Sequence, residues 1–316
     1  METTFDEKFA KSIKPLIEFE KPDYPRFEID YYADYVELLS LFSKEDGISY
    51  GDIQDLLFGE PDESTNAEIN DSNESFIDNI FARLGERTVL FSESYPFTIE
   101  KGVLLLHSSI SQNAKYYLFL LLSSSLYLFH DFEADLTTDF ETVSFETLKK
   151  FLPNAIVKQF GKNSEYHGNA REKIKQLADD IGIPIDNDEI EEISERNNQE
   201  RGLDVVGWIP FEDTCYNKIV YLGQCACGKK YESKQHDTRR FENYYVFYKT
   251  KPQHTMFIPY SLIDVKKHKF YHSDYIEKDY LVFERKRIVS LLVKNNVYDR
   301  LRSKELVEKC ILYNRG

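Results

Sequence analysis

The sequence lacks any hydrophobic run long enough to cross a bilayer. Its longest apolar stretch, residues 116–129, is interrupted by serines and is shorter than the roughly 20 residues that a transmembrane helix needs. The first residues also lack the basic and apolar segments of a secretory signal. We therefore expect a cytoplasmic protein without a membrane partner, in which residues 116–129 form a buried helix.

Cysteine is scarce, with four residues in a chain of 316. So few thiols do not make a disulfide framework, which agrees with a reducing compartment. Cys225 and Cys227 form one close pair, with Cys215 and His236 nearby. Structural zinc sites usually combine two such pairs, so zinc bound through Cys225 and Cys227 is not the expected chemistry. A cysteine nucleophile is not favoured either, because no local signature joins these thiols to a histidine.

Glycine-rich phosphate loops are absent as well. The chain contains neither the Gly-Lys-Ser/Thr ending of a P-loop nor a Gly-x-Gly-x-x-Gly pattern. Binding of ATP or a dinucleotide through those motifs is therefore excluded.

Positive charge is in the minority and unevenly distributed. The chain has 40 Lys and Arg against 55 Asp and Glu, a formal net charge of −15. Residues 1–160 contain 13 basic and 30 acidic residues, whereas residues 201–316 contain 22 basic and 14 acidic ones. Nucleic-acid binding depends on Lys and Arg, so we expect it only in the second region. The acidic first region either keeps the protein soluble, which is the favoured interpretation, or binds a protein partner.

The sequence does contain enough apolar residues for a large core, since 41% of them are hydrophobic and 15% are aromatic. The length admits two domains. We expect residues 1–150 to form an acidic, mostly helical domain with a small hairpin within residues 88–107. The polar segment 59–75 is expected to be a mobile loop. Residues 151–316 are expected to form the second domain, and the fold class is α/β or α+β.

Apolar spacing and capping residues predict further elements. Helices are expected near residues 34–42, 50–58, 76–84, 144–150, 168–182, 288–294 and 303–312. Strands are expected at residues 205–209, 219–222, 244–248 and 255–260. Residues 1–30 are expected to be an extended lead-in.

The strongest chemical signal lies between residues 202 and 234. Asp204 precedes the apolar run 205–209, and Gln224 follows a second run that starts at Ile219. Two β-rich runs joined by a polar turn predict a hairpin, in which Asp204 and Gln224 could meet. Carboxylate and amide oxygens with lysines nearby suit a hard divalent cation and a phosphate.

This pattern resembles the PD-(D/E)XK, or restriction-endonuclease-like, nuclease superfamily. There an Asp precedes a hairpin, and a Glu or Gln, one further residue and a Lys follow on the next strand. Asp204 and Gln224 match the first two positions, while Ala226 occupies the Lys position. The resemblance, which covers roughly residues 155–290, extends to uncharacterised bacterial proteins of the antiphage and restriction kind.

The resemblance implies a restriction-endonuclease-like domain with a central mixed sheet flanked by helices. It also implies that Asp204 and Gln224 bind Mg²⁺ or Mn²⁺ with a further acid, for which the candidates are Glu165, Glu172 and Glu200. An acid favoured by a helix N-terminus is the alternative interpretation of such residues. The missing amine would come from Lys229, Lys230 or Lys234.

The implied function is that of a magnesium-dependent endodeoxyribonuclease, which cleaves DNA phosphodiester bonds as a component of a bacterial antiphage defence system. The alternative is a catalytically silent nuclease-like module, because Ala226 removes the expected amine. Such a module would bind nucleic acid or a partner subunit of a defence complex. In either case the acidic N-terminal domain is the expected contact for protein partners.

Basic residues beside aromatic ones follow residue 234. Such a combination suits a phosphate backbone with bases stacked next to it. The candidate nucleic-acid-binding residues are Arg239, Arg240, Lys249, Lys251, Arg285, Lys286 and Arg287. A solvated surface is the alternative interpretation of these runs.

Overall fold

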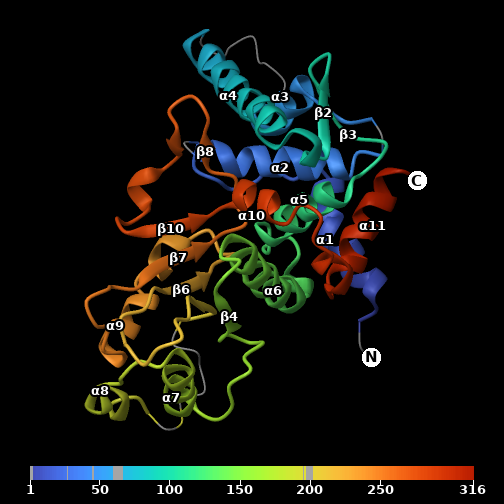
Figure 1. Cartoon of the computed structure of the whole chain (residues 1–316). Helices are drawn as coiled ribbons and strands as arrows, with labels where there is room; N and C mark the ends of the chain where they lie inside the picture. The colour runs from blue at the N-terminus through green and yellow to red at the C-terminus, as the bar shows by residue number, and fades with distance from the viewer. Residues whose placement is uncertain (1–2, 27, 45, 60–66, 195, 197–201) are drawn as a thin grey trace. The chain divides into compact units, whose positions relative to one another are not determined.

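The computed structural model describes residues 3–26, 28–44, 46–59, 67–194, 196 and 202–316. It divides into two compact units (Figure 1). Unit 1 comprises residues 1–136, 260–269 and 294–316, and unit 2 comprises residues 137–259 and 270–293. The first change of unit, at residue 137, lies near the expected domain boundary at residue 150. Two C-terminal segments, residues 260–269 and 294–316, return to unit 1, which differs from the predicted second domain at residues 151–316.

Unit 1 is mostly helical and contains a small sheet. Its helices are α1 (Phe5–Ile17), α2 (Ile29–Leu41), α3 (Tyr50–Phe58), α4 (Ala67–Phe91), α5 (Gln112–Ser123) and α11 (Lys304–Asn314). The antiparallel sheet has the order β1 (Ile48–Ser49), β3 (Val103–Leu106), β2 (Phe97–Glu100). The predicted hairpin is therefore confirmed. A separate pair joins β8 (Ile263–Asp264) to β9 (Lys269–Phe270).

Two predictions for the N-terminal region are wrong. Residues 5–17 are not an extended lead-in, because a capping box of Thr4 and Glu7 starts α1 there. Helix α4 begins at Ala67, so residues 67–75 are helical, while residues 60–66 of the expected loop lie outside the described residues. Residues 68–75 are exposed or half-buried, and local contacts hold this extension: Arg26 Nη2 donates to Asn73 Oδ1 at 2.7 Å, and the Tyr50 hydroxyl donates to the Glu74 carbonyl at 3.0 Å.

A buried ionic cluster joins α2 to α4 in unit 1. Arg87 of α4 is only 1% exposed, and its Nη1 lies 2.7 Å from Asp34 Oδ1 and 2.8 Å from Glu37 Oε1. The hydroxyls of Tyr95 and Tyr117 each donate to Glu37 Oε1 at 2.8 Å. Asp34 and Glu37 are therefore structural acids. The interpretation that the acidic first region keeps the protein soluble is wrong for these two positions.

Unit 2 is built on a five-stranded mixed sheet with the order β10-β7-β6-β5-β4. The strands are β4 (Ile156–Gln159), β5 (Val205–Trp208), β6 (Val220–Cys225), β7 (Gln253–Phe257) and β10 (Tyr280–Phe283). Neighbours from β4 to β6 are antiparallel, and neighbours from β6 to β10 are parallel. The predicted β5–β6 hairpin is confirmed, as is a mixed sheet packed against helices.

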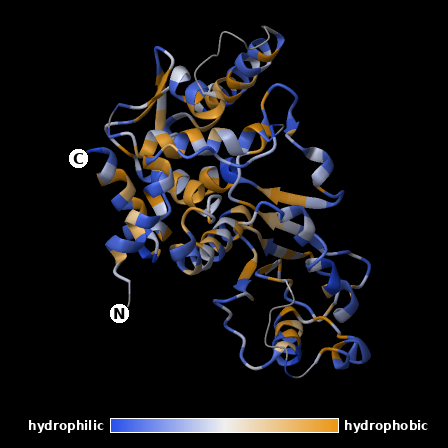
Figure 2. Cartoon of the chain, turned by 180° about the vertical axis from the view of Figure 1, so that it is seen from behind, coloured by the Kyte–Doolittle hydropathy of each residue, from blue (hydrophilic) through white to orange (hydrophobic). Residues whose placement is uncertain are grey.

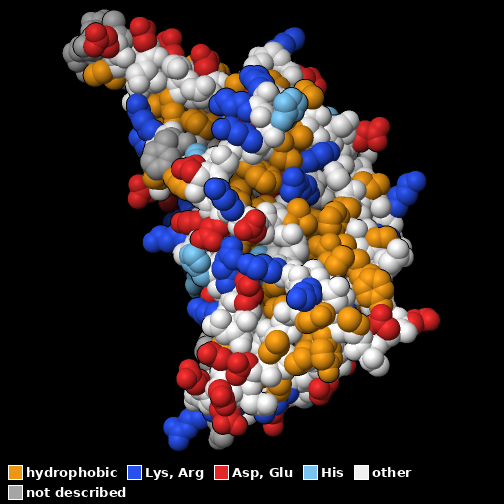
Figure 3. Space-filling view, turned by 60° about the vertical axis from the view of Figure 1, so that its left-hand side comes forward, with side chains coloured by type: hydrophobic (Ala, Val, Ile, Leu, Met, Phe, Trp, Pro, Cys, Tyr) orange, Lys and Arg blue, Asp and Glu red, His pale blue; other side chains and the backbone are white. Residues whose placement is uncertain are grey.

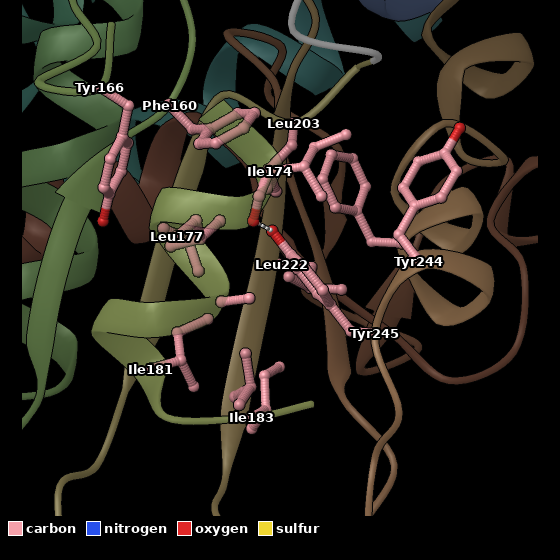
Figure 4. Close-up of a cluster of buried hydrophobic side chains, with 14 of the residues drawn as sticks. Phe160, Tyr166, Ile174, Leu177, Ile181, Ile183, Leu203, Leu222, Tyr244 and Tyr245 are labelled. Atoms are coloured by element: carbon pink, nitrogen blue, oxygen red, sulfur yellow. Dashed lines mark hydrogen bonds between the residues drawn. The ribbon is translucent and has the colours of Figure 1, made fainter. Parts of the chain in front are cut away.

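Three helices belong to the hydrophobic core on one side of this sheet: α7 (Ala170–Ile181), α8 (Asn187–Glu191) and α9 (Phe241–Tyr244). Ile174 and Leu177 of α7 are in the same buried cluster as Leu222 of β6 (Figure 4). The Tyr245 hydroxyl donates to the Ile174 carbonyl at 3.0 Å. The predicted strand 244–248 does not form: Tyr244 ends α9, and Tyr245 makes an isolated antiparallel bridge to Ile185.

Helix α10 (Arg285–Leu291) and helix α6 (Glu133–Phe151), the latter from residue 137 on, complete unit 2. Leu148 of α6 approaches β5 closely, because a Cβ at Gly207 would lie 3.3 Å from it. The helix does not start at Ser144 as predicted. Buried Leu136, Phe140 and Val143 continue its apolar face toward the N-terminus, which places Glu141 on the helix.

Hydrophobic residues are concentrated in the helices and strands, while the connecting loops are more hydrophilic (Figure 2). In the part of the chain that the structure describes, no helix combines the length and the apolar character needed to cross a membrane.

Candidate functional site

Asp204 is held at the edge of the unit 2 sheet where β4 and β6 end and β5 begins. Its carbonyl accepts from the backbone N–H of Phe160, at 2.8 Å, and of Gly161, at 3.1 Å, just after β4. Its own N–H donates to the Gly223 carbonyl of β6 at 2.9 Å. The backbone of Asp204 is thereby fixed between β4 and β6, so its side chain emerges at a defined place at the sheet end.

The structure brings Asp204 and Gln224 together. Gln224 Nε2 donates to Asp204 Oδ2 at 2.9 Å, and the backbone N–H of Cys225 donates to the same oxygen at 2.7 Å. The hairpin register explains the contact, because the pairing of Val205 with Gly223 puts the preceding and following residues opposite each other. Both hydrogen bonds orient the Asp204 carboxylate.

The other end of the Gln224 amide is unsatisfied. The residue is 5% exposed, and within the described residues its buried Oε1 has no hydrogen-bond partner. The carboxylate of Asp204 fixes the orientation of the amide, since only the NH₂ end can donate to it. A buried acceptor without a partner costs about 1–3 kcal/mol. A ligand that binds Oε1 would remove this penalty.

A second carboxylate, that of Glu141, converges on the same place from α6. Its Oε2 accepts from the backbone N–H of Lys162 at 2.9 Å. A Cβ built on Gly161 would lie 2.7 Å from Glu141 Oε2 and 3.0 Å from Asp204 Oδ1. Two acids therefore approach a single point, which only a glycine at position 161 leaves open.

The acids predicted for this role lie elsewhere. Glu172 closes the capping box of α7, where its Oε2 accepts from the N–H of Asn169 at 2.8 Å. Glu165 pairs with Lys158, and Glu200 is outside the described residues. The structure thus brings Glu141 to Asp204. The apolar periodicity of residues 136–148 is the signal that could have placed Glu141 on a helix.

The donor set of this cluster consists of two carboxylates and one amide oxygen. Hard oxygen donors of this kind suit Mg²⁺ or Mn²⁺. Across the described residues, no group of three or more His, Cys, Asp or Glu is arranged to bind a metal ion. A cation at this place would therefore depend on the amide oxygen of Gln224, together with Asp204 and Glu141.

Ala226, at the position where the resemblance implies an amine, follows the last residue of β6. Ala226 is buried, and its N–H donates to the Phe257 carbonyl at 3.0 Å. The pKa of the nearby Cys227 thiol is raised mainly by burial, while the charges of Lys234 and Lys162 act to lower it. Lys234, one of the predicted lysines, and Lys162, which the sequence analysis missed, therefore act on Cys227; the Lys162 ammonium itself donates to Thr137 Oγ1 at 2.9 Å.

The thiols themselves are poor nucleophiles. Burial raises the pKa of Cys225, and the negative charges of Asp204 and Glu141 raise it further. The nearest strand histidine is engaged elsewhere: His254 Nε2 lies 2.8 Å from Glu242 Oε1, and its Nδ1 lies 3.0 Å from Thr238 Oγ1. The structure therefore offers no thiol–histidine pair among these residues.

The predicted nucleic-acid-binding residues differ in accessibility. Arg285 is fully buried and its Nε donates to the Pro259 carbonyl at 2.7 Å, so its placement on a binding surface was wrong. Arg240 pairs with Asp237 at 3.0 Å, and Arg239 lies 3.6 Å from Glu277. The remaining residues are at least partly exposed: Lys249, Lys251, Lys286 and Arg287. On the face shown in Figure 3, Lys and Arg side chains are interspersed with Asp and Glu.

Comparison of the chain with protein-family models, with curated proteins and with solved structures finds no match.

Proposed function

We propose that unit 2 is a divalent-cation-dependent nuclease that cleaves DNA phosphodiester bonds, with Asp204, Glu141 and Gln224 as the cation-binding residues. The observation that carries this proposal is the unsatisfied Oε1 of Gln224 beside two converging carboxylates. If Gln224 were only structural, its buried Oε1 would cost free energy because it accepts no hydrogen bond. A cation bound to Oε1 would remove this cost. The order of motifs along the chain, which resembles the PD-(D/E)XK superfamily, supports the same assignment.

Each residue has a distinct part in this proposal. A bound Mg²⁺ would polarise the scissile phosphate and lower the pKa of an attacking water. The Gln224 amide and the Cys225 N–H orient Asp204, and the Lys162 N–H orients Glu141. Lys234 or Lys162 would offset the negative charge that develops on the phosphate.

The test is cleavage of supercoiled and linear DNA with Mg²⁺ or Mn²⁺. We expect nicking by the natural protein and a loss of at least about 100-fold in Asp204→Ala and Glu141→Gln, because each removes a ligand of the cation. Glu165→Gln is the matched control. The sequence suggested Glu165 as a metal ligand, but its carboxylate pairs with Lys158 instead. Equal loss in Glu165→Gln and Glu141→Gln would contradict the assignment of Glu141.

The same assay identifies the amine. We expect Lys234→Ala or Lys162→Ala to reduce cleavage, with Lys230→Ala as the control for a lysine on the exposed turn after β6. A reduction in one variant alone would assign the amine to that side chain. If neither Lys234→Ala nor Lys162→Ala reduces cleavage, Ala226 marks a position where the catalytic amine has been lost without replacement.

The second candidate function is a silent module that binds DNA or a defence-complex subunit without cleavage, which Ala226 favours. It predicts DNA binding that weakens with salt and is unchanged in Asp204→Ala. A role in antiphage defence is the setting that the resemblance implies. Phage infection of bacteria that express the natural protein or Asp204→Ala, with the products of neighbouring genes, tests this role.

A further inference from the structure

A cavity of about 470 Å³ opens in unit 2 beside β10. Small-molecule sites usually have roughly 300–1,000 Å³. The lining residues come from α6, β10 and α10: Phe151, Leu281, Phe283, Lys286, Arg287, Ser290 and Leu291. They do not include Asp204, Glu141 or Gln224, so a ligand in this cavity would be independent of the proposed nuclease function.

The walls of this cavity are apolar. The rings of Phe151 and Phe283 meet edge to face, with centroids 5.1 Å apart. Phe151 is 40% exposed although it is a large aromatic residue. Leu281 and Leu291 are only partly buried. A ligand that covers these side chains gains about 25 cal/mol for each Å² of apolar surface removed from water.

The rim of the cavity is positively charged. Burial lowers the pKa of Lys286, while the charge of Glu284 acts in the opposite direction. The ammonium group is thus partly removed from water, and an anion beside it would stabilise its charged form. Arg287 is held at the rim, because its guanidinium lies 4.9 Å from the ring centroid of Phe270.

The edge of the sheet beside the cavity is partly closed to an added strand. Among the described strands, β10 pairs with β7 alone, and the Phe283 carbonyl accepts from the Ile258 N–H at 3.0 Å. The carbonyl of Val282 therefore faces the other way, and Arg287 Nη1 donates to it at 2.6 Å. With this acceptor occupied, a peptide that pairs along β10 is disfavoured.

We propose that this cavity binds a small amphipathic organic anion. The aliphatic or aromatic part of the ligand packs against Phe151 and Phe283, and its single carboxylate pairs with Lys286. The charge of the rim selects the anion, and the apolar walls select the hydrocarbon. This combination of apolar surface and one cationic group is the common composition of a small-molecule site.

Calorimetric titration of the full-length protein with decanoate tests the proposal, with the uncharged decanol as the matched ligand. We expect saturable one-to-one binding of decanoate. Lys286→Gln should weaken decanoate binding about tenfold and leave decanol binding unchanged, because only the charged pair is lost. Ser290→Trp should abolish the binding of both ligands by filling the cavity. Lys175→Gln, on the exposed side of α7, is the control.

Three outcomes would overturn the proposal. The first is the absence of saturable decanoate binding by the natural protein. The second is an equal affinity for decanoate in Lys286→Gln and Lys175→Gln, which would make the cavity an apolar surface without selection for charge. The third is unchanged binding in Ser290→Trp, which would place the ligand elsewhere. Circular dichroism of each variant verifies that the fold is retained.

Discussion

The two units contain contrasting clusters of acidic side chains. In unit 1, Asp34 and Glu37 face the buried guanidinium of Arg87, and two tyrosine hydroxyls donate further hydrogen bonds to Glu37. In unit 2, the hydrogen bonds described for Asp204 and Glu141 come from neutral donors, an amide and backbone N–H groups. Neutral donors orient a carboxylate without cancelling its charge. The clusters thus differ in what is beside the acids: a guanidinium lies between those of unit 1, whereas an amide with an unsatisfied buried oxygen lies beside Asp204 in unit 2.

The largest effect on stability is expected when the buried ionic cluster of unit 1 is broken. Arg87→Ala leaves carboxylates buried without their guanidinium, and we expect a loss of about 3–5 kcal/mol in the free energy of unfolding. Chemical denaturation followed by circular dichroism measures it. Lys115→Ala, which breaks the half-exposed pair with Glu308, is the control and should cost less than about 1 kcal/mol. Similar losses in both variants would contradict a structural role for the buried cluster.

The second prediction concerns the cluster of unit 2. Asp204→Asn should reduce cation-dependent cleavage at least about 100-fold while changing the free energy of unfolding by less than about 1 kcal/mol. The two effects separate because Asn keeps the shape of the side chain but not its charge. Parallel cleavage and denaturation measurements test this. A stability loss as large as that of Arg87→Ala would make Asp204 a structural acid.

A third prediction uses the cation itself. Mg²⁺ or Mn²⁺ should stabilise the natural protein by about 1.4 kcal/mol when the free ion is at about ten times its Kd. The stabilisation should vanish in Asp204→Asn and in Glu141→Gln. Thermal unfolding with and without the ion measures this stabilisation. Samples from which divalent cations have been removed by a chelator provide the baseline. An equal stabilisation of the natural protein and both variants would place the ion elsewhere.

Gly161→Ala gives a smaller and more selective change. The added Cβ would meet the flexible end of Glu141, which can move, so the stability should fall by less than about 1 kcal/mol. The displaced carboxylate should nevertheless weaken the cation response. Gly228→Ala is the control, because a Cβ there meets nothing within 4 Å. An unchanged response in Gly161→Ala would separate Glu141 from the cation.

The smallest expected effect is a pH dependence in unit 2. Burial lowers the pKa of His254 from its ordinary 6.5, so the unfolded chain binds a proton more readily than the folded one. The contribution to stability is present above about pH 6.5 and is lost as the pH falls through the lower folded pKa. Denaturation midpoints from pH 8 to 5 measure it. His254→Gln should reduce the slope.

The local part of the site could be predicted from the sequence. Asp204 and Gln224 belong to one hairpin, and the alternation of its residues sets the register that brings them together. The positions of α7 and β7 follow from equally local patterns of apolar residues. These features depend on neighbours along the chain, which the sequence displays directly.

The rest depends on contacts between distant segments. Glu141 reaches Asp204 only because α6 packs against the sheet, and the start of that helix is hidden by an incomplete capping box at Ser144. Lys162 enters the site through the loop after β4. In unit 1, the acidic sequence of α2 predicts side chains that face solvent. The packing of α4 against α2 instead brings Arg87 to Asp34 and Glu37, whose charges it neutralises.

Gly161 has an evolutionary consequence. A glycine codon becomes an alanine codon through one base substitution, and the backbone at this position does not require glycine. If the two acids hold the cation, that single mutation weakens the cation response while the free energy of unfolding falls by less than about 1 kcal/mol. One reversible base change thus tunes the proposed cation site without rebuilding the domain.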